Sequence, residues 1–368
     1  MKLVMTLLVR NEADIIEANL DYHLAQGVDF VIVTDHGSTD GTRDLLRRYE
    51  QAGVVSVLRE EGEQHHQSRR VTRMARLALS QHGADWVIHN DADEFWWPLA
   101  GNLRDVFSAI PAGYGQIEVS RRNFLPRPDG PGPFYSRLIY RDRESQNLIG
   151  RPVEPKVAHR ARPDVTVAPG NHSLSGGQLR PVPLNEMLEV LHFPMRSYEQ
   201  FERKVIQIGT GYETLEHRSP EVGRDQLTLL QIFRDNGLRQ FYEAALLDDE
   251  ALQRGIDDGQ IVLDRRLQDF IRGLPRCRPA NDRPDGPQAR AFIARALETS
   301  LEVEAAQGAH TEAQAQVKAL SRRLDAVEAE LTGTTEMLQL LRESRVMRWT
   351  APLRRLWYRA RSRAGAVR

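Results

Sequence analysis

The fold is decided by the run Trp86-Val87-Ile88-His89-Asn90-Asp91-Ala92-Asp93-Glu94-Phe95. Its apolar start predicts a buried strand, and a group of acids follows where that strand ends. Asp91 and Asp93 are two residues apart, so on an extended backbone their carboxylates lie on the same side. Such a pair can hold one hard divalent cation, Mg²⁺ or Mn²⁺, which commonly completes its shell with substrate phosphates. The alternative interpretation is an acidic turn after a strand, which needs no metal.

The first hundred residues alternate between strand and helix patterns. Strands are predicted at 3–9, 30–33, 54–58 and 86–91, and the helices between them carry apolar faces that include Ile15, Leu20, Leu46 and Tyr49 and then residues 67–82. This order predicts a parallel sheet with helices on both faces. Ligands of such sheets bind at the carboxyl ends of the strands, where the polar clusters 10–12, 35–42 and 91–94 fall. The three clusters therefore predict one site.

Composition narrows the class of protein. The 368 residues carry a net charge of −1, yet residues 344–368 hold eight arginines and no acid, which leaves about −9 on the preceding 343 residues. Cys277 is the only cysteine, which excludes an intramolecular disulfide and a thiolate metal cluster. No run approaches the roughly 20 apolar residues of a membrane span. The apolar start, residues 1–9, is too short for a signal peptide, so the expected location is the cytoplasm.

Four segments in order resemble a known family. They are Leu8-Val9-Arg10-Asn11-Glu12, then Tyr22-His23-Leu24 with Gly27-Val28-Asp29, then Asp35 with Gly37-Ser38-Thr39-Asp40-Gly41-Thr42, and then Asp85-Trp86 with Asp91-Ala92-Asp93-Glu94-Phe95. Together they resemble the glycosyltransferase family 2-like group, as found among bacterial envelope-glycan enzymes. The resemblance covers about the first 100 residues, with weaker similarity to about residue 210.

The resemblance implies a GT-A fold, a Rossmann-like mixed α/β sheet flanked by helices, and transfer of a sugar from a UDP- or GDP-linked donor with Mn²⁺ or Mg²⁺ on the diphosphate. It also implies roles for individual residues. The donor site takes in Val9, Arg10, Asn11, Glu12 and Asp35, together with Ala92 beside the metal. Asp91 and Asp93 correspond to the metal-binding pair of the family, the DxD motif. Family 2 membership would further imply inversion at the anomeric carbon.

The chemistry of sugar transfer suggests further site residues. A departing diphosphate is stabilised by cations, and arginine pairs bidentately with phosphate. Arg69 and Arg70, at the start of the predicted helix 67–82, are therefore candidates for donor binding, with a solvated helix face as the alternative. An inverting transfer also needs a general base for the acceptor hydroxyl. Glu154 and Asp164 are the candidates, and Glu94 is expected to support the metal pair.

Two histidines are candidate metal ligands. His172 lies in the predicted turn Pro169-Gly170-Asn171-His172, and His192 ends the apolar strand 188–191. GT-A enzymes often supply one more ligand, commonly a histidine, from this part of the domain. The alternatives are a hydrogen-bonded structural role for either histidine and a role in acceptor binding for His172. Lys204, on a helix that Ser197 is expected to cap, can reach a phosphate or lie on a solvated face.

The C-terminal third has another pattern. We expect the transferase domain to span residues 1–275, a Pro/Arg/Asp-rich linker 276–290, a helical segment 291–343 and a basic amphipathic tail 344–368. A heptad pattern places apolar residues at a and d positions, namely Val317, Leu320, Leu324, Val327, Leu331, Leu338 and Leu341. It predicts a coiled coil that forms a homo-oligomer, or else one amphipathic helix packed on the domain. The Arg-aromatic tail fits an anionic membrane surface better than the competing partner, nucleic acid.

The sequence thus predicts a glycosyltransferase at the inner face of the cell membrane, acting on a glycan or lipid-linked acceptor in polysaccharide biosynthesis. Two rival functions remain. A nucleotidyltransferase shares the sheet and the metal acids, but it usually carries a Gly-rich phosphate loop with Arg or Lys after its first strand, and Arg10-Asn11-Glu12 is not such a loop. A non-catalytic coiled-coil scaffold would bind the nucleotide sugar without turnover.

Overall fold

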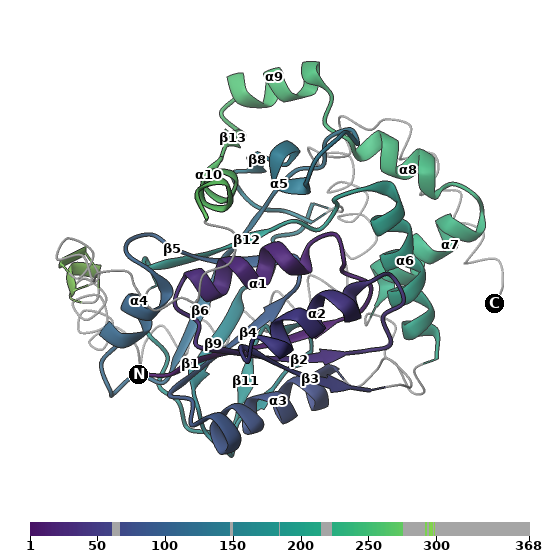
Figure 1. Cartoon of the computed structure of the whole chain (residues 1–368). Coiled ribbons are helices and arrows are strands. Elements are labelled where there is room, and N and C mark those ends of the chain that lie inside the picture. Colours follow the sequence, from purple (N-terminus) through teal and green to yellow (C-terminus); the bar gives the residue numbers. More distant parts are fainter. Residues whose placement is uncertain are drawn as a thin grey trace, which may run out of the picture.

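The structure, a computed structural model, describes residues 1–60, 67–147, 150–183, 185–214, 223–274, 291–292, 294–296 and 298 (Figure 1). In chain order its elements are β1 (Leu3–Val9), α1 (Ile16–Ala25), β2 (Phe30–Asp35), α2 (Thr42–Gln51), β3 (Val55–Arg59), α3 (Gln67–His82), β4 (Trp86–Asp91), β5 (Glu94–Pro98), α4 (Leu103–Ala109), β6 (Gln116–Val119), β7 (Arg121–Asn123), α5 (Phe134–Arg137), β8 (Tyr140–Asp142), β9 (Lys156–Arg160), β10 (Thr166–Val167), the 3-10 turn η1 (Pro169–Asn171), β11 (Leu174–Ser175), β12 (Leu188–His192), α6 (Tyr198–Glu213), α7 (Arg224–Arg234), α8 (Leu238–Ala245), α9 (Asp249–Asp257), β13 (Ile261–Leu263) and α10 (Arg266–Gly273).

A central sheet organises the molecule, with strand order β3-β2-β1-β4-β9-β6. The strands β3, β2, β1 and β4 run parallel, whereas β9 lies antiparallel to both β4 and β6. The pairs β1–β2 and β2–β3 are each joined through a helix, as parallel strands require, and α3 connects β3 to β4 on the other side of β1. Since β1 connects outward to β2 but pairs with β4 on its other side, the strand order reverses between β1 and β4. Sheets of this kind bind ligands at such a reversal.

The second sheet is smaller, and its register places three polar side chains in a row. Its order is β5-β12-β7, with β12 antiparallel to β5 and parallel to β7. His192 is paired with Glu94 on one side and with Asn123 on the other. Because β5 follows β4 after a two-residue turn, this row lies directly beside the end of the central sheet. Residues separated by about a hundred positions in the sequence therefore meet at the rim, the edge of the central sheet where β1, β2 and β4 end.

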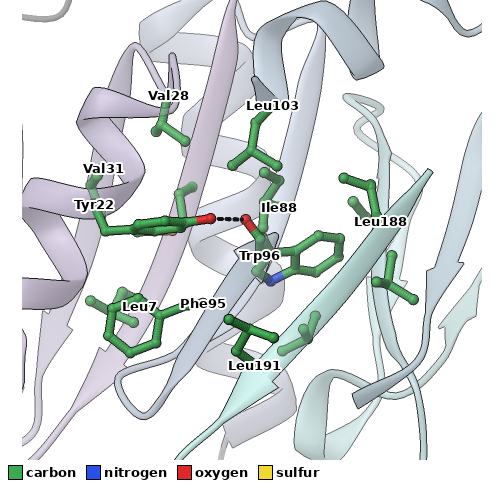
Figure 2. Close-up of a cluster of buried hydrophobic side chains, with 14 of the residues drawn as sticks. Leu7, Tyr22, Val28, Val31, Ile88, Phe95, Trp96, Leu103, Leu188 and Leu191 are labelled. Carbon is green, nitrogen blue, oxygen red and sulfur yellow. Dashed lines mark hydrogen bonds between the residues drawn. The ribbon is translucent and has the colours of Figure 1, made fainter. Parts of the chain in front are cut away.

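The two faces of the central sheet are covered by different helices. Helices α1, α2 and α4 contribute to the larger apolar cluster on one face, and α3 packs on the other face. In Figure 2 the larger cluster lies between α1 and the two sheets, and the Tyr22 hydroxyl donates to the Trp96 carbonyl over 2.9 Å. Trp86 and Trp96 are completely buried in this cluster. Burying side chains of this size contributes roughly 1.5–3 kcal/mol each, which fixes the strands that carry the rim.

The fold prediction is confirmed. The first four predicted strands and the helices between them are present, in a mixed α/β arrangement with helices on both faces. The predicted cap of α6 is also present, since the Ser197 hydroxyl accepts from the Gln200 amide over 3.2 Å. One detail differs from the extended run expected after β4. Ala92 and Asp93 form a turn, because the chain must leave the central sheet to start β5.

Several predictions concern residues that the structure does not describe. The linker 276–290, the heptad positions 317–341 and the tail 344–368 lie outside the described residues, so these assignments stay predictions. The predicted end of the domain at 275 falls one residue beyond the described stretch 223–274, and it stays a prediction too. Among the described helices, none is long and apolar enough to cross a membrane.

Candidate functional site

A cleft of about 980 Å³ opens where the order of the central sheet reverses. Its lining includes the loop after β1, the turn after β4, the end of β12 and one face of α6. From the predicted site, the lining residues are Val9, Arg10, Asn11, Glu12, Arg70, Asp91, Ala92, Asp93, Glu154, His172 and His192. Asp35, Arg69 and Asp164 are not among the lining residues. The structure thus brings most of the predicted site residues to one cleft.

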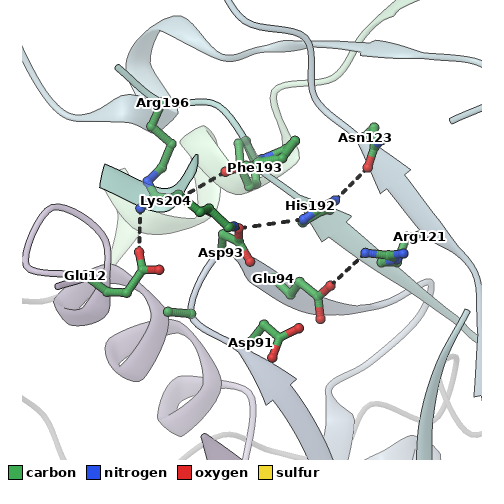
Figure 3. A network of polar contacts seen from close by, with 12 residues as sticks. Glu12, Asp91, Asp93, Glu94, Arg121, Asn123, His192, Phe193, Arg196 and Lys204 are labelled. Atoms are coloured by element: carbon green, nitrogen blue, oxygen red, sulfur yellow. Dashed lines mark hydrogen bonds and ion pairs between the residues drawn. The ribbon is translucent and has the colours of Figure 1, made fainter. Parts of the chain in front are cut away.

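Three side chains that could hold a metal ion meet at this cleft, which Asp93 and His192 line and behind which Glu94 is buried. One ligand atom each from Asp93, Glu94 and His192 lies within 4.8 Å of the others (Figure 3). Asp93 and Glu94 are buried, and one oxygen of Glu94, Oε2, has no hydrogen-bond partner among the described residues. Burial raises the pKa of Glu94 to about 7, because loss of hydration disfavours the charged form more than Lys156 and Arg121 favour it. A cation between the two acids and His192 would satisfy the orphaned oxygen.

Asn123 determines which nitrogen of His192 faces the acids. The Asn123 amide nitrogen donates to the Gln146 carbonyl over 2.9 Å, so its oxygen must be the atom 2.7 Å from His192 Nδ1. Nδ1 is therefore the donor in that contact, which leaves the Nε2 lone pair 3.7 Å from Asp93 Oδ2. Burial lowers the pKa of His192 to about 4, so the ring is neutral at neutral pH. A neutral imidazole with its tautomer fixed by a second hydrogen bond is the usual form of a metal-binding histidine.

Asp91 lies beside this cluster and has partners of its own. Lys156 pairs with its Oδ2, and the Asn171 amide donates to its Oδ1 over 3.1 Å. Asp91 and Asp93 pair with different lysines, Lys156 and Lys204, because the turn at residues 92–93 directs their side chains apart. The side chain of Asn19, from α1, fixes this turn by donating to the carbonyls of Ala92 and Glu94. Shared coordination of one cation by Asp91 and Asp93 stays a prediction.

Asp93 is the most heavily paired acid of the site. Lys204 of α6 donates to its Oδ2 over 2.5 Å, and Arg196 Nη1 lies 3.9 Å from the same oxygen. Burial alone would raise the pKa of Asp93, but the Lys204 ammonium, with His192 and Arg196, holds it well below its usual range. Arg196 is itself buried and bonds Glu12 and Asp14 of the loop after β1. The Asp93–Glu94–His192 cluster and the predicted donor loop therefore share one ionic network.

The predicted donor loop is fastened to the segment after β2. Asn11 has a positive φ of 57°, and its side-chain oxygen accepts from the Thr39 amide over 2.7 Å. The amide of Glu12 donates to Thr42 Oγ1 over 2.9 Å. Asp35 ends β2, and its carboxylate accepts from the Ser38 amide and the Arg43 guanidinium. Asp35 thus orders the loop that borders the cleft, and its predicted contact with the nucleoside stays a prediction.

The remaining candidates divide into residues inside and outside the cleft. Arg70 is buried, bonds Glu60 over 2.9 Å and lines the cleft, whereas Arg69 is exposed on α3. The Glu154 carboxylate lines the cleft and lies 3.4 Å from His172 Nε2. Asp164 is paired with Arg162 on the surface. Their roles in catalysis or binding stay predictions.

Four residues near the acids were absent from the predicted site. Lys156 and Arg121 approach Glu94 at 3.1 and 3.4 Å, Asn123 orients His192, and Arg196 joins the acids to the donor loop. Each comes from an element that meets β4 only through the folding of distant segments. No pattern in the sequence pointed to these four residues.

Comparison with protein families gives one match for this chain. The profile of glycosyltransferase family 92 matches residues 5–124, about a third of the chain. The matched range contains the parallel strands and the turn with Asp91 and Asp93. It confirms the predicted resemblance to glycosyltransferases over this range, and the mixed sheet agrees with the GT-A-like fold that the resemblance implies. Comparison with curated sequences finds no match.

Solved structures give distant similarities. TarS from S. aureus in complex with UDP-GlcNAc is 14% identical, over 64% of this chain and 72% of that chain, with a TM-score of 0.35. Glucosyl-3-phosphoglycerate synthase from Mycobacterium tuberculosis in complex with Mn²⁺, UDP and glucosyl-3-phosphoglycerate is 20% identical, over 33% of this chain and 44% of that chain, with a TM-score of 0.24.

Proposed function

We propose that residues 1–275 transfer a sugar from a UDP- or GDP-linked donor, with a divalent cation held at the end of β4. The observation that carries this proposal is the Asp93–Glu94–His192 cluster, whose Asp93 and His192 line the cleft beside the donor loop. Two carboxylates and one neutral imidazole suit Mn²⁺ or Mg²⁺ better than a softer metal. Asp91 is near enough to Glu94 to influence its charge and is the further ligand that the DxD pattern predicts.

In this proposal the bound cation supplies Lewis-acid stabilisation of the departing diphosphate. Arg70 and Lys204 line the same cleft and bind phosphate oxygens of the donor. Glu154, which lines the cleft and is exposed to solvent, accepts the proton of the acceptor hydroxyl, and His172 orients its carboxylate. The hydroxyl oxygen then attacks the anomeric carbon as the bond to the diphosphate breaks, which inverts the configuration.

Titration calorimetry with UDP-, GDP- and dTDP-sugars, with and without Mn²⁺, tests the proposal. We expect one nucleotide class to bind only with the metal, and Asp93→Asn to abolish that binding. Asp91→Asn, measured separately, decides whether Asp91 is also a ligand. Asp164→Asn is the matched control, because it removes an aspartate outside the cleft. Binding that ignores both the metal and Asp93→Asn would refute the mechanism, and metal-dependent binding without any turnover would favour the non-catalytic scaffold.

The acceptor and the location of the enzyme form a separate part of the proposal. We propose a glycan or lipid-linked acceptor at an anionic membrane, contacted through residues 344–368, with self-association through the helical segment 291–343. The eight arginines of the tail support this, since each basic residue near such a surface contributes roughly 1 kcal/mol. Deleting residues 344–368 should abolish sedimentation with anionic liposomes. Unchanged sedimentation would refute the membrane contact without affecting the donor site.

A further inference from the structure

Lysine is rare in this chain, and it is concentrated at the acids after β4. Of the 50 Lys and Arg residues only Lys2, Lys156, Lys204 and Lys318 are lysines. Two of these four contact the two aspartates of the turn, Lys156 at Asp91 and Lys204 at Asp93. An ammonium is a compact, strongly hydrated charge on a flexible stem, whereas a guanidinium binds carboxylates through a rigid fork. A lysine can therefore release a carboxylate more readily than the arginines used elsewhere in the chain.

The two lysines differ in how firmly they are held. Lys156 is 1% exposed, donates to the Gly170 carbonyl over 2.8 Å and pairs with both Asp91 and Glu94. The side chain of Lys204 is 35% exposed, and among the described residues it hydrogen-bonds only to Asp93. Breaking that single contact leaves the ammonium in a solvent-accessible cleft. Lys156 is thus fixed in place, while Lys204 is free to move once Asp93 has another partner.

The position of Asp93 supplies that other partner. The Oδ2 atom that Lys204 holds is the same atom that lies 3.7 Å from His192 Nε2, within the cluster that suits a divalent cation. An ammonium hydrogen-bonded to this oxygen and a cation coordinated by it and His192 compete for one carboxylate. Lys204 also lines the cleft proposed for the donor, so the released ammonium stays beside the diphosphate.

We propose that Lys204 is an exchangeable counter-ion of Asp93, which it pairs with before the divalent cation binds and leaves when the cation arrives. The released ammonium then neutralises the diphosphate of the donor, so metal binding prepares the cleft for an anion. Only the second step, in which the released ammonium neutralises the diphosphate, rests on the proposed function. In the first step, one ion pair is replaced by metal coordination without any covalent change.

Mn²⁺ binding to residues 1–368, followed by the electron paramagnetic resonance of free Mn²⁺, tests the first step. Lys204→Gln removes the competing ammonium and should tighten Mn²⁺ binding by about tenfold in the absence of nucleotide. Arg203→Gln removes a charge from the neighbouring exposed residue of α6 and measures the effect of charge through space alone. Lys2→Gln removes a lysine at the opposite end of β1. If Lys204→Gln binds Mn²⁺ no more tightly than Arg203→Gln does, the exchange is refuted.

Nucleotide binding tests the second step. At saturating Mn²⁺, UDP and GDP should bind Lys204→Gln about tenfold or more weakly than wild type, the opposite direction to the Mn²⁺ result. A purely structural lysine would instead lower both affinities together with the melting temperature. Unchanged nucleotide affinity would refute the second step. If wild type binds Mn²⁺ but neither nucleotide, the proposed function fails while the Mn²⁺ result still decides the first step.

Lys204→Arg provides a second test of the first step if Lys204→Gln does not fold. It preserves the positive charge but offers Asp93 a bidentate partner that is harder to displace. We expect Lys204→Arg to bind Mn²⁺ more weakly than wild type. Equal affinity of wild type and Lys204→Arg would count against the exchange as strongly as the first test.

Discussion

The rim of the central sheet and its α3 face both bury histidines, in opposite surroundings. At the rim, His192 Nε2 faces Asp93 and Glu94. On the α3 face, His89 of β4 and His159 of β9 lie 5.0 Å apart, ring centre to ring centre, on the side of the sheet that carries the apolar cluster of Val87 and Met74. The Nε2 atoms of both have no hydrogen-bond partner among the described residues. Burial lowers the pKa of all three histidines.

The comparison shows that burial alone does not make a histidine a candidate ligand. A neutral, buried ring is common to both regions, but only the rim adds carboxylates whose charges a cation can balance. The α3 face adds side chains such as Met74 and Val87, which contribute to stability by excluding water. The rim is therefore expected to decide activity and the α3 face to decide stability, and each prediction below tests that division.

The largest effect is expected at the rim, from Asp93→Asn. Loss of a charged metal ligand removes several kcal/mol of leaving-group stabilisation, which corresponds to at least about 10³-fold in turnover. Donor turnover, measured as nucleotide release from the sugar donor that binds, should fall by this factor at a temperature where the variant is still folded. A fall below tenfold would show that Asp93 does not hold the cation.

On the α3 face, Met74→Ala should produce the reverse pattern. Met74 is completely buried, and truncating such a side chain costs about 3 kcal/mol through lost burial and the cavity that remains. Urea unfolding should report this loss, while Mn²⁺ affinity stays within about twofold of wild type. A parallel loss of Mn²⁺ affinity would show that the two regions are coupled and that the division between them is wrong.

A smaller effect at the rim is expected from Asn123→Leu. This change removes the oxygen that accepts from His192 Nδ1, so the ring loses its fixed tautomer and orientation. Partners that orient a metal-binding histidine typically contribute 10–100-fold to metal affinity, and Mn²⁺ titration should show a loss in that range. If the affinity is unchanged, His192 is not a ligand and the rim histidine resembles those of the α3 face.

The sequence predicted most of the sheet because the signals for it are local. Each of the first four strands is a short apolar run that ends in a polar cluster, and the order of strands and helices restricts the topology. The loop at 10–12 was predicted to belong to the site because the carboxyl ends of neighbouring parallel strands lie at one edge of the sheet. The structure places that loop in the cleft with Asp91 and Asp93.

The partners of the acids could not be predicted, because they come from distant segments. His192 meets Glu94 and Asn123 only through the register of β5, β12 and β7, which no local pattern specifies. The turn at 92–93 also depends on Asn19, more than seventy residues earlier in the chain. Side-chain spacing suggested that Asp91 and Asp93 act as one pair, whereas the turn gives each its own lysine.

The smallest effect at neutral pH is expected from His159→Leu, and it grows as the pH falls. Burial lowers the pKa of His159 from 6.5 to about 4, so the unfolded chain binds a proton that the folded protein excludes. Its contribution to stability is complete above pH 6.5 and is lost as the pH falls toward 4. His159→Leu should therefore reduce the slope of unfolding free energy against pH by up to one proton, or about 1.4 kcal/mol per pH unit.

Urea unfolding between about pH 4 and pH 6.5 measures the slope of unfolding free energy against pH, with Val157→Ala as the matched control. Val157 is completely buried on the same face of β9 and carries no titrating group, so its truncation should lower stability equally at each pH. An unchanged slope in His159→Leu would mean that the ring is protonated within the fold, which requires an acidic partner. The α3 face would then resemble the rim, and the contrast between the two histidine environments would not hold.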